Sequence, residues 1–147
     1  MRQVKLFTIG FTKKSAETFF SKLRKAGVKK VIDIRLNNVS QLAGFAKKDD
    51  LRFFLNELCE CKYRYEPLLA PTKEMLNNYK KKKITWVDYE SAFIKLLEAR
   101  QAHTLVTPKE LDMSCLLCSE PTSEKCHRRI VAEYIKSHFQ DVEIAHL

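Results

Sequence analysis

The alternation of apolar and polar positions divides the chain into short buried strands and amphipathic helices. An apolar run at residues 4–9 predicts a buried strand that ends at Gly10, and residues 31–36 predict a second strand. Between them, apolar side chains recur at helical spacing after Ser15, and Gly27 stands where a helix commonly ends. This order predicts two parallel strands joined by a helical crossover.

The alternation continues to the end of the chain with one interruption. The further predicted segments are a helix at 51–58, strands at 63–66, 113–118 and 141–147, two helices capped by Thr72 and Thr85, and a connector at 101–112. Thr85 and Asp88 have the spacing of a capping box. The pattern therefore predicts one α/β domain, residues 1–147, of three layers. Its Rossmann-like central sheet is mainly parallel, with a two-helix insertion at 72–101 before the fourth strand.

The fourth predicted strand runs into the stretch that is richest in reactive side chains. The apolar run breaks at Pro121, and the chain restarts as a helix whose first turn holds Cys126, His127 and Arg128. Open α/β folds bind ligands outside the carboxyl ends of their strands, where a strand gives way to a helix. The candidate site therefore includes Cys118, Glu120, Cys126, His127 and Arg128.

Two charges interrupt the second predicted strand. Asp33 and Arg35 are two positions apart, so their side chains share one face near the strand's carboxyl end. Buried parallel strands are normally continuous apolar runs, which makes charges there unusual. Two interpretations stay open: a structural ion pair at the strand end, or an arginine held by its neighbour to bind an anion.

The same periodicity bears on the cysteines. Cys115 and Cys118 fall on opposite faces of the fourth strand, which argues against the pair as a metal clip, although the residue types suit zinc. Cys115 is expected to be a small core residue. We predict no metal ion, no cofactor, and reduced thiols at Cys118 and Cys126.

Composition and charge limit the partners. The net charge of +9 admits an anionic partner, but the lysines are spread over most helices, as on an ordinary solvated surface. No apolar run reaches the roughly 18 residues of a membrane span, so no membrane association is predicted. Five cysteines, an odd number without the spacing of a disulfide scaffold, favour a reducing compartment, and the cytoplasm is expected.

The residue types between the fourth predicted strand and the last helix suit an anionic substrate. A helix N-terminus lowers a thiol pKa at Cys126, and Arg128 stands beside free backbone N–H groups. His127 begins the apolar stripe of the last helix, so it is either a core histidine bonded to the backbone or a proton carrier. The predicted catalytic residues are Cys118, Glu120 and His127, and the predicted substrate-binding residues are Asp33, Arg35, Cys126 and Arg128.

The order of short motifs resembles the uncharacterised family catalogued as domain of unknown function 488, over essentially the whole chain. The motifs are Ile9-Gly10-Phe11-Thr12, Asp33-Ile34-Arg35, Gly44-Phe45, Leu69-Ala70-Pro71-Thr72, Leu116-Leu117-Cys118-Ser119-Glu120 and Cys126-His127-Arg128. The resemblance implies a compact α/β domain with the motif residues gathered at one pocket, and it implies no particular reaction. That family often has histidine or tyrosine where this chain has Phe11, so any role of a polar ring is lost.

Three classes of function remain. The leading hypothesis is an enzyme that acts on an anionic substrate, either a phosphate-bearing small molecule such as a nucleotide or a nucleic acid. The second is a thiol enzyme or redox sensor that uses Cys118 and Cys126. The third is a non-catalytic module that binds a nucleotide or nucleic acid.

Overall fold

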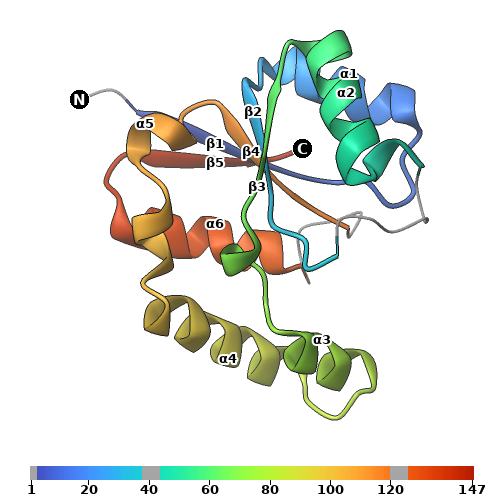
Figure 1. The fold of residues 1–147 in the computed structure, drawn as a ribbon. Helices are drawn as coiled ribbons and strands as arrows, with labels where there is room; N and C mark the ends of the chain where they lie inside the picture. The colour runs from blue at the N-terminus through green and yellow to red at the C-terminus, as the bar shows by residue number, and fades with distance from the viewer. Residues whose placement is uncertain (1–2, 38–43, 120–125) are drawn as a thin grey trace.

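The computed structural model describes residues 3–37, 44–119 and 126–147 and has an α/β fold built on one parallel sheet (Figure 1). The sheet has five strands in the order β3-β2-β4-β1-β5, and every neighbouring pair is parallel. The strands are β1 Val4–Gly10, β2 Lys30–Asp33, β3 Lys62–Tyr65, β4 Ser114–Cys118 and β5 Val142–His146. The predicted Rossmann-like, mainly parallel architecture is confirmed.

Helices cover both faces of the sheet, so the domain has three layers with the sheet in the middle. The helices are α1 Ala16–Ala26, α2 Lys48–Cys59, α3 Lys73–Lys80, α4 Trp86–Ala99, α5 Pro108–Leu111 and α6 His127–His138. Figure 1 shows α1 and α2 on one side of the sheet and α6 on the other, with α3 and α4 beyond α6. The predicted two-helix insertion is therefore α3 and α4, which adds to the layer that contains α6.

The two faces of β4 enter different cores, as strand periodicity predicts. Cys115 and Leu117 pack with the apolar residues of α1 and α2. Leu116 and Cys118 pack with those of α4 and α6. Cys115 is fully buried, and burial raises its pKa well above the usual value of a thiol, which fits an unreactive core residue.

The predicted helix ends are largely confirmed. Ser15 accepts a hydrogen bond from the backbone N–H of Thr18, and Gly27 ends α1 with a φ of 74°, in the left-handed region that favours glycine. Thr72 and Thr85 cap α3 and α4 in the same way as Ser15. At Thr85 only that half of the predicted capping box is present in the structure.

Two expectations about boundaries are wrong. The segment 101–112, expected to be a connector, contains a 3-10 turn, Ala102–Leu105, and helix α5, which a reciprocal capping box of Thr107 and Glu110 begins. A single helical turn is too short to produce a periodic apolar pattern. Strand β2 ends at Asp33 and not at residue 36, because its pairing with β3 and β4 ends at that residue.

No helix within the described ranges is both long and apolar enough to cross a membrane. That the whole chain forms one domain stays a prediction, although both cores pack on the same sheet.

Candidate active site at the carboxyl edge of the sheet

A crevice is expected where β1 and β4 end. The two strands are neighbours, with Gly10 opposite Cys118, and the backbone N–H of Thr12 donates to the carbonyl of Ser119 at 3.0 Å. After β1 the chain enters α1 on one face of the sheet, whereas α6, the helix that follows β4, lies on the other face (Figure 1). Neighbouring parallel strands whose connections leave to opposite faces open a binding crevice at their carboxyl ends.

A cleft of about 460 Å³ lies at this edge. Its volume is in the range of small-molecule sites. One wall comes from the ends of the strands and the start of α6, and its residues are Thr12, Arg35, Leu36, Asn37, Cys118, Ser119 and His127. The other wall comes from α3, whose contributing residues are Lys73, Leu76, Asn77 and Lys80. These four follow the helical repeat, so a single face of α3 closes the cleft.

Asp33 holds Arg35 in a fixed orientation inside this wall. The carboxylate accepts from Nε of Arg35 at 2.9 Å and from Nη2 at 2.8 Å, and both side chains are buried. Tyr63 donates its hydroxyl to the same carboxylate at 2.6 Å. The guanidinium also lies 5.3 Å from the ring centre of Phe11. Arg35 also lines the cleft, so the buried ion pair holds this guanidinium at the cleft wall.

His127 is fixed by the backbone that follows β2. Its Nε2 lies 2.8 Å from the carbonyl oxygen of Ile34. A carbonyl only accepts hydrogen bonds, so Nε2 carries the proton and Nδ1 of the neutral ring keeps its lone pair. Burial lowers the pKa of His127 to about 4, and the Arg128 charge adds to this effect, against the Ile34 bond and Asp33. The ring is thus a backbone-bonded histidine that also lines the cleft.

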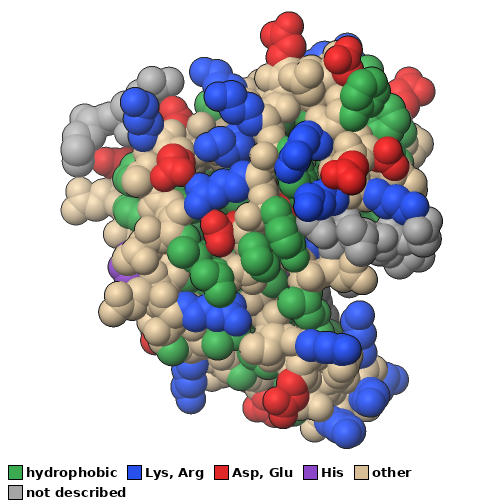
Figure 2. Space-filling model, in the orientation of Figure 1, with side chains coloured by type: hydrophobic (Ala, Val, Ile, Leu, Met, Phe, Trp, Pro, Cys, Tyr) green, Lys and Arg blue, Asp and Glu red, His purple; other side chains and the backbone are tan. Residues whose placement is uncertain are grey.

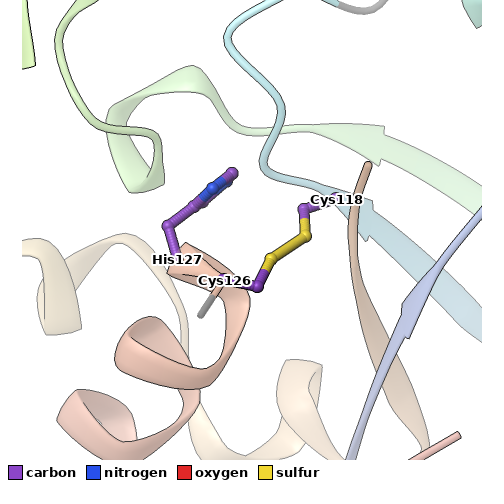
Figure 3. Close-up of side chains that lie close together, drawn as sticks. All are labelled: Cys118, Cys126 and His127. Carbon is purple, nitrogen blue, oxygen red and sulfur yellow. A yellow bond between two sulfur atoms is a disulfide. The ribbon is translucent and has the colours of Figure 1, made fainter. Parts of the chain in front are cut away.

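A disulfide joins Cys118, at the end of β4, to Cys126, the residue before α6 (Figure 3). The prediction of two reduced thiols is therefore wrong for this structure. The reason is tertiary: the end of β4 and the start of α6 flank the same crevice, which brings the two sulfurs together. Both cysteines are buried, and the imidazole of His127 lies beside the bond between their sulfurs.

Arg128 lies behind the cleft and not in its wall. Its side chain is 1% exposed. Nε donates to Oγ1 of Thr8 at 3.2 Å, and Nη1 lies 3.6 Å from Sγ of Cys118. The guanidinium therefore supports the disulfide from the buried side, on the face of β1 that carries Thr8.

The structure thus gathers most of the predicted site. Asp33, Arg35, Cys118, Cys126, His127 and Arg128 all lie at this edge, and of these Arg35, Cys118 and His127 line the cleft. Glu120 lies outside the described residues.

The sequence interpretation missed the contribution of α3. Thr72 caps a helix in which Lys73 and Lys80 share one face, and that much was visible in the pattern. What the pattern does not contain is that this face turns toward the strand ends. A larger hollow, of about 750 Å³, lies around the other end of α6 at residues 136–142 and holds none of the motif residues.

Comparison with known protein families gives a match. The family model described as domain of unknown function DUF488 matches residues 15–135. No curated protein matches the chain, and no solved structure does.

Proposed function

The chain belongs to the family described as domain of unknown function DUF488, and from its site we propose that it is an enzyme acting on a phosphate-bearing or otherwise anionic substrate. The substrate would lie in the cleft between α3 and the strand ends. Its reacting group would lie beside Cys118 and His127, in the wall opposite α3.

The charge of the cleft carries this proposal. Its lining holds three permanent cations, Arg35, Lys73 and Lys80, and the described lining residues include no carboxylate. Asp33 lies behind Arg35 and neutralises one of these charges, so the two lysines of α3 supply the excess. Figure 2 shows Lys and Arg side chains gathered over the part of the molecule where α3 lies. A concave surface lined by one sign of charge concentrates ligands of the opposite sign.

Each cation suits a different part of the task. The Arg35 guanidinium is planar and held by Asp33, so it can present oriented donors to phosphate or carboxylate oxygens. Lys73 and Lys80 are exposed and flexible, and act as point charges. The volume of the cleft, about 460 Å³, favours a substrate no larger than a nucleotide or sugar phosphate over a bound polymer.

Nδ1 of His127 is our candidate for proton transfer in the disulfide form. The Ile34 bond leaves this nitrogen as an acceptor, and the lowered pKa keeps the ring neutral at neutral pH. A base must be unprotonated to act, although a low pKa also makes it a weak base. Arg128 would serve as a positioning residue through Thr8 and Cys118, because its side chain does not line the cleft.

A thiol redox function is the second candidate. The observation in its favour is the Cys118–Cys126 bond at the same edge. A redox centre would cycle between this bond and two thiols. Against this candidate, the cationic α3 wall has no role in electron transfer between thiols.

A thermal-shift titration tests the anion site. Inorganic phosphate, nucleotides and sugar phosphates are added to the wild type and to Lys73→Gln, Lys80→Gln and Lys95→Gln. Lys95 is an exposed lysine of α4 outside the cleft, which makes it the matched control. A ligand that binds only the native state raises Tm by mass action. We expect a smaller rise in Lys73→Gln and Lys80→Gln than in the wild type and Lys95→Gln.

Equal shifts in all four proteins would contradict the proposed site. For any ligand that binds, its consumption by the wild type and by His127→Gln is then followed chromatographically. Binding without turnover in the wild type would leave a binding module and reject the enzyme.

A further inference from the structure

We propose that Cys118, Cys126 and His127 bind one Zn²⁺ when the disulfide is opened, and that the fourth coordination position faces the cleft. The inference rests on the proposed function only in placing the ion in the wall of the same cleft. It also reverses the prediction, made from the sequence, that the chain holds no metal.

The three ligand atoms already lie together. The two sulfurs and one ring nitrogen of His127 are all within 4.8 Å of one another. Tetrahedral zinc, with Zn–S of about 2.3 Å and Zn–N of about 2.0 Å, needs these sulfur and nitrogen atoms roughly 3.5 to 3.8 Å apart. The site therefore needs side-chain rotations and no new fold.

The backbone spacing of the cysteines also suits an ion between them. Their Cα atoms are 7.7 Å apart. Disulfides usually span about 4.4 to 6.8 Å between Cα atoms. Two thiolates that meet through a metal are separated by the metal's own bonds, so they span more than two sulfurs joined directly.

His127 has the supporting bond that metal-binding histidines need. Such a histidine normally donates its other ring N–H to a carbonyl or carboxylate, which fixes the tautomer and the ring orientation. Nε2 of His127 is bonded to the carbonyl of Ile34, which leaves Nδ1 for the metal. On the other side, Nη1 of Arg128 lies 3.6 Å from Sγ of Cys118, where its charge favours the thiolate.

The number and kind of ligands indicate zinc with an open position. Thiolates and imidazole together suit Zn²⁺ better than Mg²⁺ or Ca²⁺, which prefer oxygen. Three protein ligands are typical of catalytic zinc, which keeps a water in the fourth position, whereas structural zinc takes four. Cys118 and His127 line the cleft, so that position opens toward the bound anion. Zn²⁺ held there would supply a Lewis acid at the cleft, and Nδ1 of His127 would then be a ligand and not a base.

Zinc and the disulfide exclude each other. A dithiol reductant gives two electrons and two protons to the Cys118–Cys126 bond: the S–S bond breaks, two S–H groups form, and the dithiol becomes a disulfide. Zn²⁺ then takes the place of the two thiol protons, which are released to solvent. A small-molecule disulfide reverses this change: it takes the two electrons from the pair and two protons from solvent to become two thiols, the Cys118–Cys126 bond re-forms, and the ion is released.

Zinc stoichiometry tests the site. The protein is reduced with a phosphine, which becomes the phosphine oxide, then mixed with Zn²⁺ without phosphate, desalted, and measured by elemental analysis. We expect about one zinc per chain for reduced wild type and none for the disulfide form. Cys126→Ser and His127→Gln should lose stoichiometric zinc. Cys59→Ser, which changes a thiol outside the cluster, should keep it. Reduced wild type without zinc, or zinc retained in Cys126→Ser, would overturn the proposal.

Thiol protection gives a reading that needs no variant. Reduced wild type is alkylated with and without Zn²⁺, and the labelled cysteines are located by mass spectrometry. Zinc should lower the labelling of Cys118 and Cys126 but not that of Cys59. If zinc changes the labelling of all three cysteines equally, or of none, the site is rejected. Anion binding is measured separately on the metal-free disulfide form, so either proposal can fail while the other stands.

Discussion

Nε2 of His127 donates to the carbonyl oxygen of Ile34 at 2.8 Å, across 93 positions of sequence. The bond joins the first residue of α6 to the segment just after β2. Along the chain, the elements from α2 to β4 separate them, including the α3–α4 insertion. It fixes both the position of the imidazole at the cleft and the tautomer of its neutral form.

This relationship predicts how stability depends on pH in the metal-free disulfide form. The pKa of His127 is about 4 in the folded protein, against 6.5 for a free histidine, because burial and Arg128 disfavour the charged ring. Between these values the unfolded chain binds the proton and the folded protein does not. The contribution of His127 to the free energy of unfolding is therefore complete above pH 6.5 and is lost as the pH falls toward 4. We expect a loss of about 3 kcal/mol across that window.

His127→Gln is the control for the pH effect. Glutamine can donate its amide N–H to Ile34 but does not titrate. Urea unfolding at several pH values should give a shallower dependence for this variant than for the wild type. Parallel curves would mean that His127 titrates normally in the folded protein.

Arg35→Lys should weaken phosphate binding about tenfold, which corresponds to about 1.4 kcal/mol. A lysine nitrogen cannot pair with both oxygens of Asp33 and still present a planar donor to the ligand. Isothermal titration with inorganic phosphate measures the effect. Arg100→Lys changes an arginine outside the cleft that donates to the carbonyls of Leu68 and Ala70, so its affinity should match the wild type. Affinity unchanged in Arg35→Lys would assign Arg35 to the fold alone.

Arg128→Lys should destabilise the protein by about 2 kcal/mol. Lysine has a single nitrogen, so it cannot reach both Thr8 and Cys118 from the buried position of Arg128. Arg129→Lys is the adjacent control, because Arg129 is partly exposed and pairs with Glu90 and Glu133. Its cost should stay below about 1 kcal/mol, as for surface ion pairs. Denaturant unfolding of both variants checks the difference, and equal costs would contradict the buried role of Arg128.

Thr72→Ala should weaken phosphate binding without changing any cleft residue. The threonine hydroxyl accepts from the N–H of Met75 and starts α3, a helix with no buried residue of its own. Loss of such a cap costs about 1 kcal/mol, and α3, whose core-facing side chains are only partly buried, has less packing than α4 to resist fraying. Thr85→Ala removes the equivalent cap of α4, whose buried Tyr89, Phe93 and Leu97 hold it in place. Titration with phosphate should show a loss for the first variant only; a loss for both would uncouple the effect from α3.

The sequence by itself determined the elements and the faces of the strands. Within the described residues, apolar spacing located each strand and the major helices. The two-residue repeat put Cys115 and Cys118 in different cores. Side-chain alternation and helix capping depend on residues a few positions apart, so a linear pattern contains them. For the same reason, the short α5 escaped the prediction, since one turn carries no repeat.

Only the tertiary structure decided what meets at the carboxyl edge. The strand order puts β4 between β1 and β2, which brings Asp33, Cys118 and the start of α6 together. The closure of the cleft by α3, the burial of Arg128 and the Cys118–Cys126 bond all depend on that order. Apart from the Cys118–Cys126 bond, which joins consecutive elements at a sequence separation of 8, these are contacts between elements far apart in the chain. These contacts form only when the helix layers pack on the sheet, and the spacing of residues along the chain does not encode that packing.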